Sequence, residues 1–179
     1  MTTNIEFHSV LQGIKDVKAR TEAFHKLSNE DKRKEIAWDA LQLVLIDRLL
    51  PSHGNYWTGD LSDIKLESST PEDLQARLIC ATQSTNSRCV VCARGAVMVS
   101  TIVLGNHIDP VRDYSIAHGD QYNIQGFTMQ EMKDMESEYE DGWFDHPYDT
   151  NTKEKLANIL CNVLTNGFFN TEDKTDYLV

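Results

Sequence analysis

The chain has 179 residues, of which 40% are apolar and 25% charged, and its 28 acidic residues outnumber its 17 lysines and arginines, giving a formal charge of −11. This length and composition predict one globular domain over residues 1–179, and the charge argues against direct contact with nucleic-acid phosphates. No stretch reaches the ~18 uncharged apolar residues of a membrane span, and the N-terminus lacks the features of a secretory signal, so we expect a cytoplasmic protein without membrane association.

The first part of the chain is predicted to be helical. A short amphipathic helix is indicated by the spacing of four apolar residues: Val10, Leu11, Ile14 and Val17. Ser28 precedes Asn29-Glu30-Asp31 as an N-cap does, and apolar residues then recur at steps of three and four until Pro51. The pattern predicts a long helix over 29–50.

Turn residues dominate the next segment, where Tyr56 and Trp57 suggest a short strand or an ordered loop within 55–66. Thr70-Pro71-Glu72-Asp73 then has the order cap, proline, acids that begins a helix. Its apolar face would contain Leu74, Leu78 and Ile79. The polar run 82–87 is predicted to connect this helix to the next segment.

The segment 88–106 is the most apolar part of the chain, with charges only at Arg88 and Arg94. A segment that is apolar on every side is typical of a buried element. Its many β-branched residues favour a strand, but its length and a stripe of small residues at helical spacing favour a helix. We expect a buried central helix near 89–104, around which the other elements pack.

Two further helices are predicted in the C-terminal third. Thr128 with Glu131 matches the capping box, and the following helix would end near Asp141, with its acids outward. A last helix would begin near Asn151 and stop at Asn166-Gly167. With short strands near 108–124, the expected fold is mainly α with minor β, a bundle of five to six helices.

Acidic residues are concentrated between 131 and 150, where Lys133 is the one base. Such a surface attracts basic partners, and Trp143 could serve as an aromatic anchor within it. A solvated acidic face that aids solubility is the alternative. The residues expected to bind a partner are Glu131, Asp134, Glu136, Glu138, Glu140, Asp141 and Trp143.

The cysteines allow two chemical hypotheses beside simple packing. In the first turn of a helix, the thiols of Cys89 and Cys92 would be favoured as thiolates, and His107 or His118 could act as the base of a cysteine-dependent enzyme or redox protein. A zinc site is the second hypothesis, although one C-x-x-C pair supports it only weakly. Its ligands would be Cys80, Cys89 and Cys92, with Cys161 or one of the histidines as the fourth. Otherwise we expect no cofactor.

Small-ligand binding is a third possibility, with Tyr56, Trp57 and Arg94 lining a pocket near the central helix. No phosphate-binding loop is present, so nothing supports nucleotide hydrolysis.

Four short motifs occur in order from about Asp39 onward: Asn55-Tyr56-Trp57, the C-x-x-C-A-x-G-A core at 89–96, Phe127-Thr128, and Asn166-Gly167-Phe168-Phe169. In this respect the chain resembles a loose family of small uncharacterised proteins of bacteriophages, prophages and bacteria. Arg94 stands where the resemblance implies a more apolar residue. The resemblance implies a mainly helical accessory protein, in the host cytoplasm or associated with the virion, and it supplies no activity.

The leading hypothesis from the sequence is therefore a non-enzymatic phage-type interaction protein whose acidic surface binds a basic host or virion protein. Inhibition of a host defence protein, with carboxylates placed where phosphates would bind, is one form of it.

Overall fold

The computed structural model describes residues 7–53, 57–59, 70–87, 89–106, 109–110, 122–123, 126–141, 152–173, 175 and 177. Six helices lie within these residues: α1 (Val17–His25), α2 (Asn29–Leu45), α3 (Pro71–Gln83), α4 (Ala93–Gly105), α5 (Met129–Glu140) and α6 (Thr152–Asn166). Short strands accompany them: β1 (Leu49–Pro51), β2 (Trp57–Gly59), β3 (Cys89–Val91), β4 (Asp109–Pro110) and β5 (Tyr122–Asn123). The prediction of a mainly helical fold with minor β structure is confirmed, and strands occur in both segments where they were expected.

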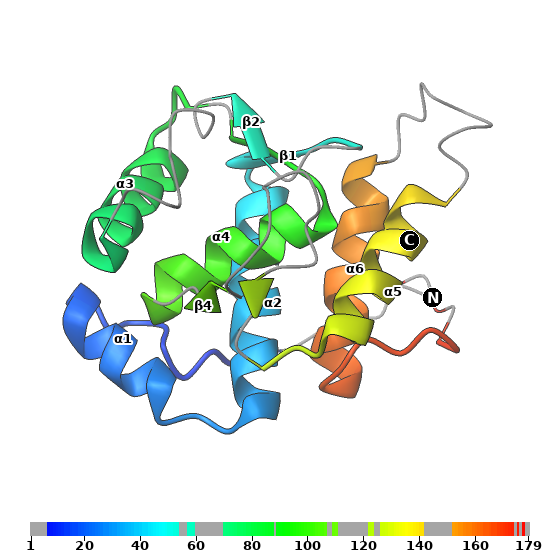
Figure 1. The fold of residues 1–179 in the computed structure, drawn as a ribbon, viewed down its shortest axis with the longest axis horizontal. Coiled ribbons are helices and arrows are strands. Elements are labelled where there is room, and N and C mark those ends of the chain that lie inside the picture. Colours follow the sequence, from blue (N-terminus) through cyan, green and yellow to red (C-terminus); the bar gives the residue numbers. More distant parts are fainter. Residues whose placement is uncertain are drawn as a thin grey trace.

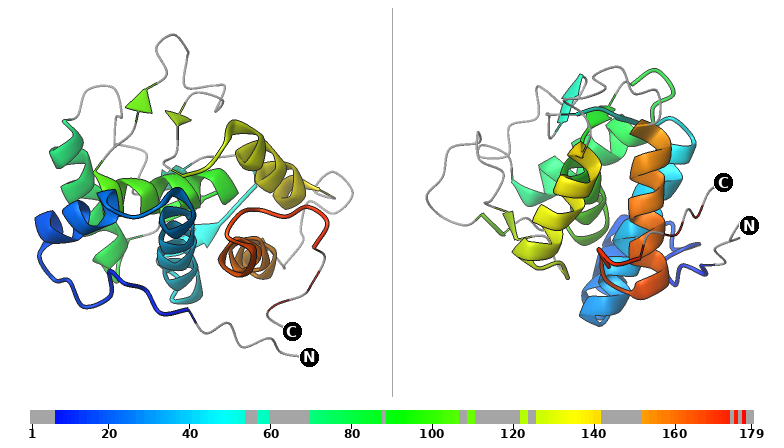
Figure 2. Two further views of the ribbon diagram at one scale, coloured as in Figure 1. Left: turned by 90° about the horizontal axis from the view of Figure 1, so that it is seen from below. Right: turned by 90° about the vertical axis from the view of Figure 1, so that its right-hand side faces the viewer.

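Helix α4 lies at the middle of the molecule, and every one of its residues is buried. Its N-terminal end lies towards α5 and its C-terminal end towards α1 (Figure 1). Helix α2 crosses it, and α6 runs alongside α2 in the most extensive contact between two elements (Figure 2). The prediction of a buried central helix is therefore confirmed for 93–105. Among the described residues, no helix has both the length and the apolar character that crossing a bilayer requires.

The prediction that this helix begins at residue 89 is wrong. Residues 89–91 form β3, the middle strand of a sheet with the order β1-β3-β2, and Cys92 is the N-cap of α4. Strand β3 pairs parallel to β1, with Leu49 opposite Cys89, and antiparallel to β2, with Trp57 opposite Val91. The backbone of β3 forms hydrogen bonds to a strand on each side, and its β-branched residues favour the extended conformation. Pairing with these distant strands therefore makes 89–91 a strand and not part of the helix.

Helix α2 ends at Leu45, so the prediction of a helix to residue 50 is also wrong. Asp47 adopts a positive φ of 57°, and the backbone N–H of Arg48 donates to Leu43 O (2.8 Å), which closes the helix as a Schellman motif does. The chain then enters β1, and Pro51 is the last residue of that strand rather than a helix stop.

The N-terminal prediction requires a third correction. Helix α1 begins at Val17, after Asp16 accepts a hydrogen bond from the backbone N–H of Ala19 (2.7 Å), and residues 10–13 form a turn with Gly13 at a φ of 95°. Leu11 is buried in this irregular segment without a helix. Apolar spacing over so few residues does not distinguish a helix from a loop that covers the core.

The C-terminal helices agree with their local signals. Thr128 and Glu131 form the complete capping box of α5, whose buried residues are Met132, Met135 and Tyr139. Gly167 has a φ of 74° directly after α6, as predicted for its left-handed stop. Asn151, the expected cap of α6, lies outside the described residues.

Candidate functional site

The acids of α5 fall into two groups because of their position around the helix. Side chains four residues apart lie on the same side of a helix. The rows 131–135–139 and 132–136–140 of α5 both contain buried side chains, namely Met132, Met135 and Tyr139. The acids in these rows, Glu131, Glu136 and Glu140, therefore border the buried face. Each has a cationic or histidine partner on another element: Arg33 Nη1 to Glu131 Oε1 (3.3 Å), Arg94 Nε to Glu136 Oε2 (3.0 Å) and His53 Nδ1 to Glu140 Oε2 (3.1 Å). Half of the predicted partner-binding acids therefore join α5 to the rest of the protein.

The other group, Asp134, Glu138 and Asp141, is called the outer acids below. Asp141 is exposed, and Asp134 and Glu138 are partly exposed. Asp134 accepts a hydrogen bond from Gln130 Nε2 (2.8 Å). Within the described part of the chain, neither Asp134 nor Asp141 has a cationic side-chain partner within ion-pair distance. Trp143, Asp145 and Asp149 lie outside the described residues.

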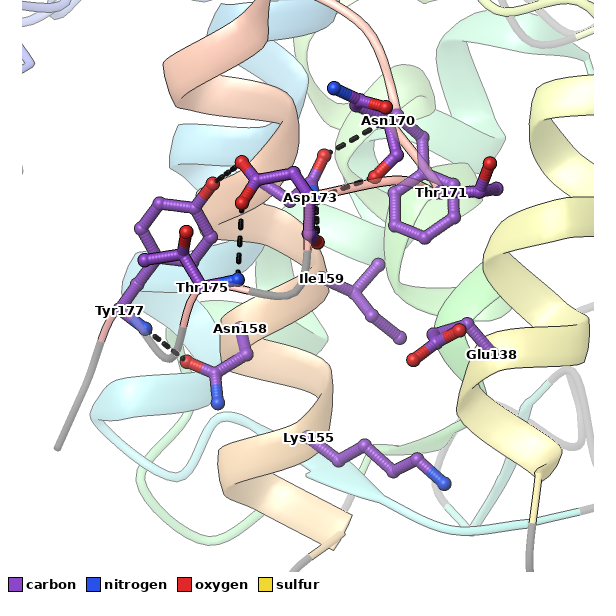
Figure 3. Close-up of a pocket in the computed structure, with 11 residues that line it drawn as sticks. Glu138, Lys155, Asn158, Ile159, Asn170, Thr171, Asp173, Thr175 and Tyr177 are labelled. Atoms are coloured by element: carbon purple, nitrogen blue, oxygen red, sulfur yellow. Dashed lines mark hydrogen bonds between the residues drawn. The ribbon is translucent and has the colours of Figure 1, made fainter.

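A cavity of about 190 Å³ opens between α5, α6 and the C-terminal segment. Glu138 lines it from α5, Lys155, Asn158 and Asn162 from α6, and Asp173 from the C-terminal segment. Figure 3 shows Glu138 reaching from α5 towards α6, with Asp173 on the opposite wall. Lys155 Nζ donates to the backbone oxygen of Asp141 (2.5 Å), so its charge lies at the C-terminal end of α5, where the helix dipole favours a cation. We refer to this space as the C-terminal pocket.

Asn162 holds the segment that forms one wall of this pocket. Its Nδ2 donates to Asn170 O (2.9 Å) and Asp173 O (3.2 Å). Its Oδ1 accepts from Asn170 N (2.8 Å) and Asn166 Nδ2 (3.4 Å). Both donors and both acceptor positions of this buried amide are used, so the segment after α6 is fixed to the helix.

Asp173 remains ionised in this wall. Hydrogen bonds from Thr175, Tyr177 and Asn166 hold the pKa of its carboxyl well below the usual range. Because each of these donors favours the charged form, the wall carries a permanent negative charge opposite Glu138.

Of the two cysteines predicted to be reactive, Cys92 lies where burial disfavours the thiolate. Cys92 is the N-cap and not a first-turn residue, and burial raises the pKa of its thiol to about 11, although the backbone N–H groups of Gly95 and Arg94 favour the thiolate. Glu136 and Glu140 lie close enough to disfavour it further. Cys89 is buried in β3. The prediction that both cysteines lie in the first turn of a helix is therefore wrong, and the proposed bases, His107 and His118, lie outside the described residues.

The zinc hypothesis is not supported by the arrangement of its residues. Cys80 is exposed on α3, whereas Cys161 is buried in α6. In the described ranges, no three His, Cys, Asp or Glu side chains come together in a way that could hold a metal ion. Burial raises the pKa of the Cys161 thiol to about 12, which suits a packing residue.

Arg94 has a structural explanation. It is buried, its Nε donates to Met132 O (3.2 Å), and it pairs with Glu136. This pairing accounts for an arginine in a segment that is otherwise apolar. The two other predicted ligand-binding residues cannot be assigned, because Tyr56 and the side chain of Trp57 lie outside the described residues.

A second cavity, of about 270 Å³, lies where the segment 9–14 crosses α1, α2 and the end of α4, and we call it the N-terminal cavity. Its polar walls include Arg20 of α1 and Glu35 and Asp39 of α2, and its apolar walls include Trp38 and Leu104. Sequence analysis missed it. The available signal was the pair Glu35 and Asp39, four residues apart beside the buried Ile36 and Ala40 of the same helix.

The two carboxyl groups of this cavity differ in their surroundings. Glu35 Oε2 accepts from Ser9 Oγ (2.5 Å) and Oε1 from the backbone N–H of Val10 (2.7 Å). Burial raises the pKa of the Asp39 carboxyl to about 6; nearby Ser100 and Arg20 favour its charged form, and Glu35 disfavours it. Asp39 Oδ2 and Ser100 Oγ are both buried, yet neither meets hydrogen-bond geometry with any described atom.

Comparison of the chain with family models, curated proteins and solved structures found no match.

Proposed function

We propose that the protein is a non-enzymatic interaction protein that binds a basic surface of a partner protein through the outer acids of α5 and the C-terminal pocket beside them. A host or virion protein is the partner that a phage-type origin implies. The observation that carries this proposal is the division of the acids on α5: one group is used inside the molecule, whereas Asp134 and Asp141 have no cationic partner among the described residues.

The C-terminal pocket fits one basic side chain of such a partner. Its volume of about 190 Å³ equals that of about six waters at ~30 Å³ each, which suits a single residue. Glu138 and Asp173 lie on two of its walls, and Asn158 and Asn170 also line it. The negative charges of the two acids would attract a lysine or arginine that enters the pocket.

The electrostatics also favour this class of partner over nucleic acid. The chain has an excess of acidic residues, and the ionised Asp173 extends the negative surface across the pocket from α5. Binding through such a surface weakens as salt screens the charges, with a Debye length of about 10 Å at ~0.1 M ionic strength.

The test compares two triple variants, each of which removes three negative charges. One carries Asp134→Asn, Glu138→Gln and Asp141→Asn, and the matched control carries Glu22→Gln, Asp47→Asn and Glu72→Gln at exposed positions elsewhere. The probe is a fluorescent peptide of alternating arginine and glycine, whose binding is followed by fluorescence anisotropy at low and at high salt.

The outer-acid variant is expected to lose roughly tenfold or more in affinity at low salt, because exposed charges contribute about 0.5–1 kcal/mol each. The control is expected to bind nearly as the unaltered protein does. Equal losses in the two variants would mean that only net charge matters, and the proposed surface would then be wrong. Circular dichroism confirms that both variants are folded.

A further inference from the structure

We propose that the N-terminal cavity binds a small zwitterion, namely a free α-amino acid with an apolar side chain. This inference is independent of the proposed function, because the cavity uses α1, α2 and α4 and shares no residue with α5 or the C-terminal pocket.

Two atoms of opposite charge character in this cavity have unused hydrogen-bonding capacity. Asp39 Oδ2 and Arg20 Nε are both buried, and neither atom has a hydrogen-bond partner among the described residues. Both residues line the cavity, one from α2 and one from α1, and Arg20 lies near enough to favour the charged form of Asp39. A buried donor or acceptor without a partner is costly, and most such groups in proteins are satisfied by another group, a water or a ligand.

The polar residues of the cavity indicate which class of ligand it could bind. Glu35 is already used, since both of its oxygens accept hydrogen bonds from the segment 9–14 and so hold that segment as a wall. Among the charged side chains of the cavity, an acceptor on Asp39 and a donor on Arg20 are buried without a hydrogen-bond partner in the described residues. An ammonium group suits Asp39 and a carboxylate suits Arg20, and both bonds would be charge-assisted.

The size of the cavity and its apolar lining also suit an amino acid with an apolar side chain. The cavity volume of about 270 Å³ corresponds to about nine waters at ~30 Å³ each, which is enough space for one amino acid. Leu11, Ile14, Trp38 and Leu104 line the remaining surface and would contact an apolar side chain. A ligand with only one of the two charges would leave either Asp39 or Arg20 unpaired.

The experiment titrates the purified full-length chain with L-valine, L-leucine, L-methionine and L-phenylalanine separately, to millimolar concentration. The readout is a saturable rise in the thermal unfolding midpoint, because a ligand that binds only the native state stabilises it. For leucine, 3-methylbutylamine lacks the carboxylate and 4-methylpentanoate lacks the amine. At least one of the four amino acids is expected to bind, and each of its single-charge analogues at least about tenfold more weakly.

Variants assign the binding to the cavity. Asp39→Asn and Arg20→Gln are each expected to weaken binding at least about tenfold. Lys18→Gln and Glu22→Gln remove exposed charges of opposite sign on either side of Arg20 in α1 and are expected to leave binding unchanged. Because the two cavity variants lie on different helices, one still gives an answer if the other does not fold. The proposal is overturned if none of the four amino acids binds, if a single-charge analogue binds as tightly, or if the folded cavity variants bind as the unaltered chain does.

Discussion

Replacing Asp39 by asparagine tests how much a buried carboxyl group costs this fold. The carboxyl pKa of about 6 in the folded protein compares with an ordinary value of 3.8, and at ~1.4 kcal/mol per pKa unit the difference corresponds to about 3 kcal/mol. Because the folded state holds the proton more tightly than the unfolded state, the wild-type chain is penalised only when this group loses its proton. The penalty is therefore absent below pH 3.8 and is complete above about pH 6.

Asparagine has nearly the same shape and carries no charge at any of these pH values. We expect Asp39→Asn to match the wild-type stability at about pH 4 and to exceed it by up to about 3 kcal/mol at about pH 8. Urea denaturation followed by far-ultraviolet circular dichroism, at a series of pH values, measures this difference directly. Taking the difference between the two proteins cancels the titration of groups that the substitution does not affect.

The exposed Asp47→Asn variant is the control, and its stability relative to wild type should change little with pH. The reasoning fails if Asp39→Asn is less stable than wild type at about pH 8, or if its stability difference is the same at both ends of the range. Either result would mean that the Asp39 carboxylate has a favourable partner in the folded protein.

Four other substitutions test three separate features by urea denaturation. Asn162→Leu removes the four hydrogen bonds that fix the C-terminal segment, so it should cost about 2–4 kcal/mol and speed protease cleavage there, and unchanged cleavage would contradict the role of this amide. Tyr139→Phe removes a buried hydroxyl without a hydrogen-bond partner among the described residues and should stabilise the protein by about 1 kcal/mol, whereas a loss of that size would reveal a partner. Gly126→Ala should cost more than Gly167→Ala, for which the positive φ alone costs about 1 kcal/mol. The new Cβ at Gly126 would lie 2.9 Å from Asn29 O in the backbone, whereas the one at Gly167 would meet a flexible side chain; equal losses would argue against this contact.

Several helix caps, which depend on residues close together in the sequence, were predicted correctly. The capping box of Thr128 and Glu131, the N-caps at Ser28 and Thr70, and the left-handed Gly167 all lie where the sequence placed them. Each of these features depends on atoms within a few residues of one another, so no knowledge of the rest of the fold is needed.

Errors arose where a distant segment decides the outcome. Residues 89–91 form a strand because β1 and β2 pair with it, and neither partner is close in sequence. The same error placed Cys89 and Cys92 in a helical first turn and suggested reactive thiols. Cys92 is the N-cap of α4, where the backbone N–H groups of Gly95 and Arg94 still favour its thiolate, but burial has the larger effect and raises the pKa of the thiol.

The candidate site was predicted only in part for a similar reason. Composition identified the acidic α5, but it did not indicate that Arg33, His53 and Arg94 would engage half of its acids. Those partners come from elements that only the folded chain brings to α5. The spacing of Glu131, Glu136 and Glu140 relative to the buried Met132 and Met135 was the one available signal, because residues four apart share a helix face.

The complete enclosure of α4 also has a consequence for biosynthesis. This apolar helix is covered partly by α1, α2 and α3, which precede it, and partly by α5, which leaves the ribosome after it, while α6 must still pack against α2. During translation its side chains are therefore exposed on one side until the last third of the chain has emerged. An unprotected apolar stretch of this kind is a binding site for chaperones and a starting point for aggregation, so the yield of soluble protein should depend on how quickly the C-terminal helices are synthesised and how well chaperones shield α4 until then.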